Sequence, residues 1–306
     1  WSKQEDVVWS VRDNRYTCVQ SAHATGKTHV AAAIAIWFGC CFPNSVVLTT
    51  ANSWAQVTGV LWQTIRTLVK QAKFDLGLKL LPKKPEARIG ESIMFGFSPS
   101  KPDAAQGYHR SDILAIFDEA QGIQDISTWD AFSSMMTSAG SKWLALGNPL
   151  YPRGPFYQRF RDPNWSKQRI CALEHPNYIT GEEVVPGALT RQAIDEIEQD
   201  PVRGPGTLYW STRVLGEFPE VGDDTLLPES YLRQCLKLPT NAKLIPGRYI
   251  GLDPAAMGND RTVCLALVDG RVVDVQSWRR AMPEKIVVQA LTMAAKWGVP
   301  QENIQF

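Results

Sequence analysis

The stretch that decides the fold runs from Gln20 to Ala33 and reads Gln-Ser-Ala-His-Ala-Thr-Gly-Lys-Thr-His-Val-Ala-Ala-Ala. Residues 16–20 before it form a short β-prone run, and residues 30–37 after it are alanine-rich and apolar, as in a buried helix. A Gly-Lys-Thr between a strand and a helix is typical of a phosphate loop, in which backbone N–H groups and the helix N-terminus face a polyphosphate. The sequence therefore predicts a nucleotide-binding α/β domain.

The predicted nucleotide contacts are Ser21, His23, Ala24, Thr25, Gly26, Lys27 and Thr28. We expect Lys27 to reach the β- and γ-phosphates of ATP and Thr28 to ligate Mg²⁺. The loop usually opens with glycine, whereas this chain has Ser21, so Ser21 must take a backbone angle open to any residue or the loop must be slightly reshaped. Gly-Lys-Thr also occurs by chance, and the prediction needs a second motif.

That second motif is the run Asp-Ile-Leu-Ala-Ile-Phe-Asp-Glu-Ala over residues 112–120. A continuous apolar run of this length indicates a fully buried parallel strand. At its end, Asp118 would hold the Mg²⁺ shell, and Glu119 would orient and deprotonate the attacking water. The alternative is a buried strand followed by a surface acidic turn, and the upstream phosphate loop argues against it.

Further strands are predicted at residues 45–50, 93–97 and 142–147, with helices at 51–70 and 128–137 between them. This alternation predicts a parallel sheet flanked by helices, with its site at the carboxyl edge of the strands. Asn148 would then lie near the γ-phosphate, although Asn148-Pro149 also reads as a plain turn. Gln4, on a helix predicted over residues 1–12, either contacts the adenine edge or is a surface glutamine.

Composition limits the classes of protein that remain. The 306 residues suffice for two domains, and a formal net charge of +1 excludes nucleic-acid binding through bulk charge. The six cysteines form no Cys-x-x-Cys pair, so we expect free, buried thiols rather than a metal site. We find no signal peptide and no membrane-spanning run, which predicts a soluble intracellular protein. The start at Trp1 and the stop at Phe306 suggest a fragment.

The second half of the chain predicts a change of domain. Helices at 190–199 and 208–217 indicate a small helical subdomain near 175–218, and residues 221–240 read as an acidic linker. Residues 248–268 then predict a β-hairpin with Asp253 at the end of its first strand and Asp260 in its turn. A strand at 271–277, a helix at 284–297 and the start of a strand at 304 follow.

The order of these motifs resembles that of one family. The stretches that carry the likeness are Gln4, residues 21–28, Gln106-Gly-Tyr-His109 before 113–119, residues 144–149, Val214-Leu-Gly-Glu-Phe-Pro219, and 251–253 with 258–262. Together they resemble the large terminase subunit, the DNA-packaging motor of tailed bacteriophages, over most of the chain. The resemblance implies an ATPase domain of the ASCE P-loop type over residues 1–220. The linker would span 221–240, and a truncated N-terminal part of an RNase H-like nuclease domain would span 241–306.

The resemblance also implies a function and a set of partners. ATP hydrolysis with Mg²⁺ would drive double-stranded DNA into a procapsid, and in the complete protein a nuclease using Mg²⁺ or Mn²⁺ would cut concatemeric DNA. The expected partners are a portal protein, the procapsid, a small terminase subunit and further copies of the chain, as a ring that is a pentamer on the portal. The expected location is the host cytoplasm, docked on the procapsid.

Residue roles follow from the same likeness. Lys27, Thr28, Asp118 and Glu119 would carry hydrolysis, and Asn148 would sit in the coupling motif. Some relatives have a phosphate-loop arginine near the position of His23, and a histidine is no permanent cation at neutral pH.

The catalytic arginine must therefore come from elsewhere. We expect Arg110 of a neighbouring subunit to supply it, unless that arginine only pairs with an acid such as Asp112.

In the nuclease part, Asp253 matches the first metal-binding acid. Asp260 either approaches the same metal or is a turn residue. The next acid would follow the strand that begins at 304, so we expect this chain to hydrolyse ATP but not to cleave DNA.

Two other functions share the phosphate loop and the acidic strand: a nucleic-acid helicase or remodelling ATPase, and a regulatory NTP-binding protein with no DNA role. A helicase would have a second motor-like domain. In its place this chain has the predicted β-hairpin of residues 248–268, with Asp253 at the end of its first strand.

Overall fold

The computed structural model describes residues 1–98, 110–219, 246–255, 260–279 and 282–305. The chain divides into two compact units, Trp1–Tyr231 and Leu232–Phe306. The division falls within 220–245, outside the described residues, so the predicted bounds of 1–220, 221–240 and 241–306 stay a prediction.

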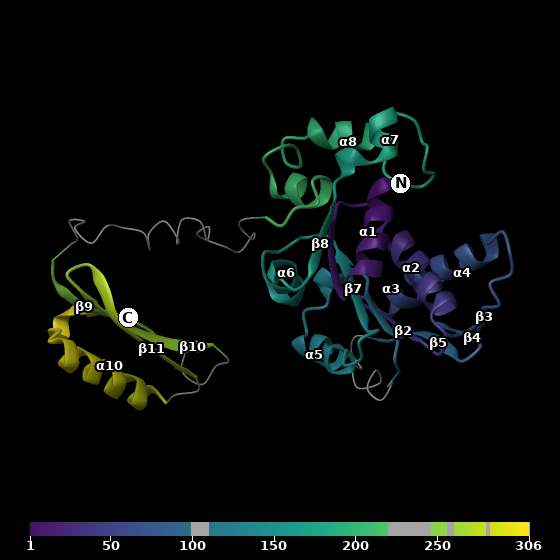
Figure 1. Cartoon of the computed structure of the whole chain (residues 1–306). Coiled ribbons are helices and arrows are strands. Elements are labelled where there is room, and N and C mark those ends of the chain that lie inside the picture. Colours follow the sequence, from purple (N-terminus) through teal and green to yellow (C-terminus); the bar gives the residue numbers. More distant parts are fainter. Residues whose placement is uncertain (99–109, 220–245, 256–259, 280–281, 306) are drawn as a thin grey trace. The chain divides into compact units, whose positions relative to one another are not determined.

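The first unit is built on an eight-stranded sheet (Figure 1). Its strands are β1 (Tyr16–Ser21), β2 (Val46–Thr50), β3 (Lys79–Leu80), β4 (Glu86–Ile89), β5 (Ser92–Gly96), β6 (Ile113–Phe117), β7 (Lys142–Gly147) and β8 (Ser166–Ile170). Their order is β3-β4-β5-β2-β6-β7-β1-β8. The six strands from β5 to β8 in this order pair in parallel, and β3 and β4 add antiparallel pairs at one edge. The predicted parallel-rich α/β sheet is confirmed.

Helices cover both faces of this sheet (Figure 1). One group comprises α1 (Ser2–Asp13), α2 (Lys27–Cys41), α3 (Trp54–Gln56), the π-helix η1 (Val57–Leu61) and α4 (Trp62–Gln71). The other comprises α5 (Ile126–Met135) and α6 (Gly154–Arg161). Each group has its own apolar core: Phe38 and Ile65 belong to the first, and Trp129 and Phe156 belong to the second. Ala31, Ala32 and Ala35 of α2 are fully buried, as the alanine-rich run predicted, while Ala33 is half-buried.

A helical part follows β8 and packs against the phosphate loop. It contains the 3₁₀-helix η4 (Ala172–Glu174), α7 (Pro176–Thr180), α8 (Arg191–Glu198) and the π-helix η5 (Trp210–Val214). Its core joins Leu189, Ile194 and Trp210 to Ala22 of the loop itself. The nucleotide loop therefore shares a core with the helices near 175–218.

The structure corrects three details of the first unit. The helix predicted over 51–70 consists of three pieces with a π-helix in the middle. Residues 151–175 contain α6 and β8, which were not predicted, and β3 and β4 were also missed. The first four residues of β8 alternate between half-buried and exposed at the sheet edge and only Ile170 is buried, so its sequence, Ser-Lys-Gln-Arg-Ile, lacks the apolar run of a central strand.

The second unit is a four-stranded sheet of order β11-β10-β9-β12 with one long helix. Its elements are β9 (Arg248–Asp253), β10 (Arg261–Val268), β11 (Arg271–Arg279), α10 (Pro283–Trp297), the 3₁₀-helix η6 (Gln301–Asn303) and β12 (Ile304–Gln305). β9 and β10 form the predicted antiparallel hairpin, and β12 pairs with β9 in parallel. Ile250 and Cys264 pack with Ile286 and Met293 in its core. The RNase H-like fold of this unit stays a prediction.

Candidate nucleotide-binding site

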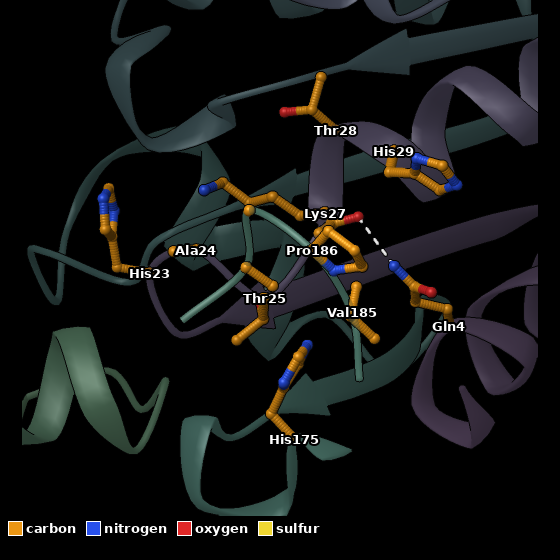
Figure 2. A pocket seen from close by; sticks show the side chains of 13 residues that line it. Gln4, His23, Ala24, Thr25, Lys27, Thr28, His29, His175, Val185 and Pro186 are labelled. Carbon is orange, nitrogen blue, oxygen red and sulfur yellow. Dashed lines mark hydrogen bonds between the residues drawn. The ribbon is translucent and has the colours of Figure 1, made fainter. Parts of the chain in front are cut away.

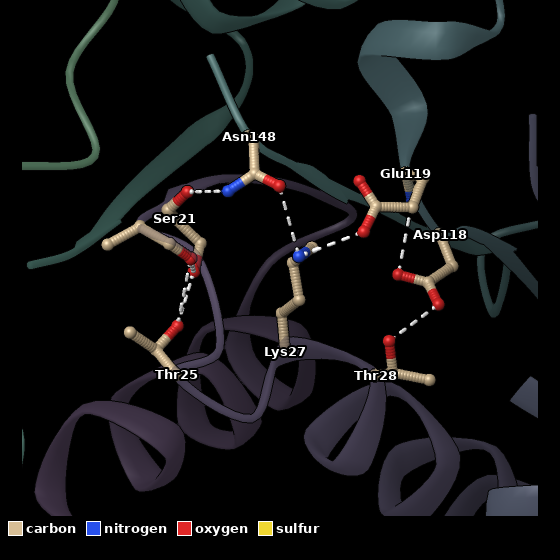
Figure 3. A network of polar contacts seen from close by, with 8 residues as sticks. Ser21, Thr25, Lys27, Thr28, Asp118, Glu119 and Asn148 are labelled. Carbon is tan, nitrogen blue, oxygen red and sulfur yellow. Dashed lines mark hydrogen bonds and ion pairs between the residues drawn. The ribbon is translucent and has the colours of Figure 1, made fainter. Parts of the chain in front are cut away.

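The phosphate loop begins where β1 ends and continues into the first turn of α2. Gly26 has φ 83° and Ala24 has φ 54°, so these two residues take the left-handed backbone conformation. Ser21 does not, which confirms that it occupies an angle open to any residue. Its hydroxyl lies 2.7 Å from Thr25 Oγ1 and donates to the Ala22 carbonyl at 3.0 Å (Figure 3). Ser21 therefore replaces the usual glycine and also ties the loop together.

Lys27 joins the phosphate loop to the ends of two neighbouring strands (Figure 3). Its Nζ atom lies 2.9 Å from Glu119 Oε1 and donates to Asn148 Oδ1 at 3.2 Å. Asn148 Nδ2 in turn donates to the Ser21 carbonyl at 2.7 Å. Because β7 lies between β6 and β1, Asn148 at its end bridges the loop and the acids.

Thr28 and Asp118 form the second pair of the site. Thr28 Oγ1 donates to Asp118 Oδ2 at 2.9 Å, and the Glu119 backbone N–H donates to Asp118 Oδ1 at 3.0 Å. Mg²⁺ binds through one or two protein oxygens together with phosphates and water. A hydroxyl and a carboxylate at this distance fit that donor set, so these two residues could hold the ion.

The side chain of Asp118 is 1% exposed, and this burial changes its pKa. Burial and, next, the charge of Glu119 raise the pKa of Asp118 to about 6, while Lys27 and the hydroxyl of Thr28 lower it in part. A cation beside this carboxyl would favour its ionised form.

Glu119 differs from its neighbour in conformation and exposure. Its φ is 49°, in the left-handed region, which costs an ordinary residue about 1–3 kcal/mol. Its side chain is 29% exposed, unlike that of Asp118. The carboxylate is thus held out toward Lys27 and solvent, where a water molecule can approach it.

A cavity of about 390 Å³ lies along the phosphate loop (Figure 2). It is lined by Gln4, His23, Ala24, Thr25, Gly26, Lys27, Thr28, His29, His175, Val185, Pro186, Gly187 and Ala188. Asp118 and Glu119 do not line the cavity themselves, but Lys27 and Thr28, which contact them, do. Gln4 reaches into it from α1, and its Nε2 donates to the Gly26 carbonyl at 3.1 Å. The structure thus places Gln4 beside the loop, and its predicted contact with adenine stays untested.

His23, at the loop position where some relatives have an arginine, and Arg110, the predicted catalytic arginine, lie at different places in the first unit. Loss of solvent lowers the pKa of His23, and the charges of Lys27 and Arg213 lower it further, so His23 carries no fixed charge at neutral pH. Arg110 lies just before β6, at the opposite end of that strand from Asp118. Within the described part of the chain, Arg110 forms no ion pair with Asp112. It is not brought to the site of its own chain.

The sequence did not reveal that the helical part contributes to the site. His175 and residues 185–188 line the cavity. The backbone N–H of His23 donates to the Arg213 carbonyl at 2.9 Å. Gly216 (φ 66°) lies so close to the loop that a Cβ there would sit 2.6 Å from the Ala22 nitrogen. Only the Leu-Gly-Glu-Phe run around Gly216 could have signalled this contact.

Asp253 and Asp260, the two acids predicted to bind metal in the second unit, are exposed. Asp253 ends β9 and Asp260 directly precedes β10. Among the described residues, no three or more His, Cys, Asp or Glu side chains gather as a metal site. The stretch 106–109 lies outside the described residues.

Five cysteines are described, and all five are free; Cys18, Cys171 and Cys264 are buried. Cys40 is partly buried and Cys41 is exposed, so the expectation of buried thiols was wrong for these two. Across the described part of the chain, no helix has the length and apolar character needed to span a membrane.

The fold and the loop geometry resemble those of a P-loop NTPase domain, and comparison with known proteins points to one group within that class. No family model matches the chain. Over 166 residues it is 27% identical to a probable large terminase subunit of Enterobacteria phage P7; the match covers 51% of this chain and a third (33%) of that relative.

Solved structures extend the likeness. The chain superposes on the ATPase domain of the Thermus phage P74-26 large terminase with a TM-score of 0.53 and 16% identity, covering 70% of this chain and 93% of that one. The large terminase of the thermophilic bacteriophage D6E in complex with ADP gives 0.56 and 14%, covering 99% and 75%. The HK97 bacteriophage large terminase gives 0.56 and 16%, covering 96% and 66%. The resemblance to large terminase subunits is thus confirmed, with the fold shared at low identity.

Proposed function

We propose that this chain is an ATP-hydrolysing subunit of a viral DNA-packaging motor. The observation that carries the proposal is the set of contacts among Lys27, Glu119 and Asn148 beside the Thr28–Asp118 pair. Three strand ends and one helix N-terminus converge there, which is the arrangement that binding and hydrolysis of a nucleoside triphosphate require. The similarity to large terminase subunits supports the same class of activity.

In this proposal each residue has a defined role. The backbone N–H groups of residues 24–28 and Lys27 bind the phosphates of ATP. Thr28 and Asp118 hold Mg²⁺, which neutralises charge developing on the phosphates when bound. Glu119 accepts a proton from the attacking water, and Asn148 connects the terminal phosphate to the Ser21 carbonyl and β7.

The larger assembly is proposed on similarity alone. Hydrolysis would drive double-stranded DNA into a procapsid through a portal protein, with a small terminase subunit and a ring of copies, in the host cytoplasm. The P7 relative and the D6E and HK97 structures, named as large terminases, support this class of partner.

The second unit would contribute a nuclease in the complete protein. Asp253 and Asp260 are the acids proposed to bind Mg²⁺ or Mn²⁺ in an RNase H-like domain. Two-metal cleavage needs carboxylates around ions about 3.5–4 Å apart. The coverage of nearly all of this chain by the D6E large terminase is what supports this assignment.

Phosphate release from ATP in the presence of Mg²⁺ tests the proposed function. We expect stimulation by procapsids that carry the matching portal, together with double-stranded DNA. Stimulation by single-stranded DNA alone would indicate a helicase or remodelling enzyme. A rate that responds to neither would indicate a regulatory NTP-binding protein and contradict the motor assignment.

A further inference from the structure

One wall of the cavity is formed by a segment that no motif marks. His175 and residues 185–188 line the cavity together with the first turn of α2, and Figure 2 labels His175, Val185 and Pro186 among the lining side chains. The wall offers the apolar groups of Val185, Pro186 and Ala188 together with backbone atoms, and no charged group. If the phosphates of a nucleotide lie at the N-terminus of α2, its base and ribose can lie along such a wall.

A single buried side chain holds both ends of this segment. Asn177 of α7 is 1% exposed. Its Nδ2 donates to the Val185 carbonyl at 2.9 Å and to the Leu189 carbonyl at 3.0 Å, and its Oδ1 accepts from the Val185 N–H at 2.7 Å. Three backbone groups at the two ends of the segment are therefore satisfied by one amide.

The same segment is tied to the phosphate loop. The Leu189 N–H donates to the Ala24 carbonyl at 3.1 Å, and Ala24 is one of the two loop residues with left-handed backbone. On the other side, the Asn177 N–H donates to Nδ1 of the buried His175 at 3.2 Å. A continuous chain of hydrogen bonds thus connects His175, Asn177 and residues 185–189 to the loop.

We propose that Asn177 positions the 185–189 segment as the wall that receives the nucleoside, the base and ribose, of the bound nucleotide. The inference rests on the proposed ATPase function and adds which element recognises the organic part of the substrate. Asn177 itself touches no substrate. Its effect on the wall passes through Val185 and Leu189, and Leu189 also contacts the Ala24 carbonyl, so we expect Asn177 to act on binding of the nucleoside more than on binding of the phosphates.

The test compares ATP with inorganic tripolyphosphate, which carries the phosphates without the nucleoside. In Asn177→Ala we expect the affinity for Mg²⁺-ATP to fall about tenfold or more and KM to rise in parallel, because buried backbone groups lose their partners and the wall shifts. The affinity for tripolyphosphate and the value of kcat should stay close to wild type. Calorimetric titration and steady-state kinetics on the full chain give these quantities.

Two further variants keep the test decisive. Thr190→Ala removes the side-chain cap that Thr190 gives to the Ala193 N–H in the same helical part, and it should leave the affinities for ATP and tripolyphosphate unchanged. Ala188→Trp would fill the proposed nucleoside end without touching Asn177. It should abolish the advantage of ATP over tripolyphosphate, even if Asn177→Ala does not fold.

Three other outcomes would contradict the proposal or the function on which it rests. Unchanged ATP affinity in both Asn177→Ala and Ala188→Trp would overturn the assignment of the wall. An equal loss of ATP and tripolyphosphate in Asn177→Ala would overturn it as well, because Asn177 would then support the phosphate loop in general. If the wild-type chain bound neither compound, the proposed ATPase function would fail first.

Discussion

At the residue scale, a single network connects the phosphate loop to two strand ends. Lys27 contacts Glu119 and Asn148, and Asn148 contacts the Ser21 carbonyl. Removal of any one member leaves buried polar groups of the others without partners, which costs about 1–3 kcal/mol for each. The network is therefore both a candidate catalytic site and a part of the fold.

Asp118 gives a prediction that couples stability to pH. Its pKa is raised from 3.8 to about 6, chiefly by burial. Between these two pH values the folded chain binds more protons than the unfolded chain, so this group makes the nucleotide-free protein less stable as pH rises from about 4 to 6. One pKa unit corresponds to about 1.4 kcal/mol. Asp118→Asn should therefore raise the free energy of unfolding by about 1–3 kcal/mol at neutral pH, while abolishing Mg²⁺-dependent hydrolysis.

Urea unfolding at about pH 7.5 and pH 4.5 measures this effect, and the gain should shrink at the lower pH. Asp125→Ala is the matched control, for which we expect the opposite change in the free energy of unfolding. Asp125 caps α5, and hydrogen bonds from Ser127 lower its pKa, so its loss should destabilise the protein at neutral pH. If Asp118→Asn is no more stable than wild type at pH 7.5, burial does not oppose the charge of Asp118.

Some residues of the candidate site could be predicted from the sequence and others could not. Lys27 and Thr28 were predictable because the phosphate loop imposes a fixed spacing, and Asp118 because it follows an apolar strand. Asn177 was not predictable, since its role depends on side-chain hydrogen bonds to a segment whose path is set by tertiary packing. The left-handed backbone of Glu119 likewise has no signal in a stretch of ordinary residue types.

At the element scale, the π-helix η5 and the turn after it connect the helical part to the phosphate loop. The Arg213 carbonyl accepts from the His23 N–H, and Gly216 packs on Ala22. π-helical turns are rare and often occur at functional sites. Movement of η5 would therefore displace the loop backbone directly.

Gly216→Ala tests this contact. The added Cβ would lie 2.6 Å from the Ala22 nitrogen and 2.6 Å from the Ile170 carbonyl oxygen, where only backbone could yield. We expect a loss of more than about 2 kcal/mol in the free energy of unfolding and weaker nucleotide binding. Thermal unfolding and ATP titration are the measurements.

Gly206→Ala is the matched control, since Gly206 also has positive φ (86°) but no atom within 4 Å of an added Cβ. It should cost only about 1 kcal/mol, the backbone strain alone, with ATP affinity unchanged. Equal effects of the two substitutions would show that the packing of Gly216 on the loop does not matter.

Elements with strong apolar patterns were predictable from the sequence. The central strands β1, β2, β6 and β7 are buried on both faces; β2, β6 and β7 read as largely apolar runs and β1 as a β-prone run, and the hairpin of the second unit was also predicted. The edge strands β3 and β8 were missed because exposure allows polar residues there. The π-helix η1 was missed because its sequence does not differ from that of an α-helix.

At the scale of the whole molecule, the position of Arg110 bears on assembly. It is exposed at the amino end of β6, whereas Asp118 and Glu119 follow the carboxyl end. An arginine there cannot reach the phosphates of its own chain without a change of fold. We propose that it acts instead at the site of a neighbouring copy.

Mixing two inactive variants tests action between subunits. Arg110→Ala should lose most of the hydrolysis rate, because an arginine supplied by a neighbour contributes about 10³–10⁵-fold. Adding Lys27→Ala subunits, which retain Arg110, should restore part of the rate. Arg12→Ala, which removes another exposed arginine, serves as the control and should leave the rate unchanged. Absence of rescue at every ratio would assign the catalytic arginine to the same chain or to another residue.

The central claim is that Lys27 and Glu119 bind and hydrolyse ATP, and one measurement tests it most directly. Wild type, Lys27→Ala and Glu119→Gln are incubated with Mg²⁺ and ATP, and released phosphate and retained nucleotide are both quantified. The account predicts that Lys27→Ala retains no nucleotide, while Glu119→Gln retains intact ATP without releasing phosphate, because only the water-activating carboxylate is lost. Phosphate release by Glu119→Gln at a rate near wild type would contradict it.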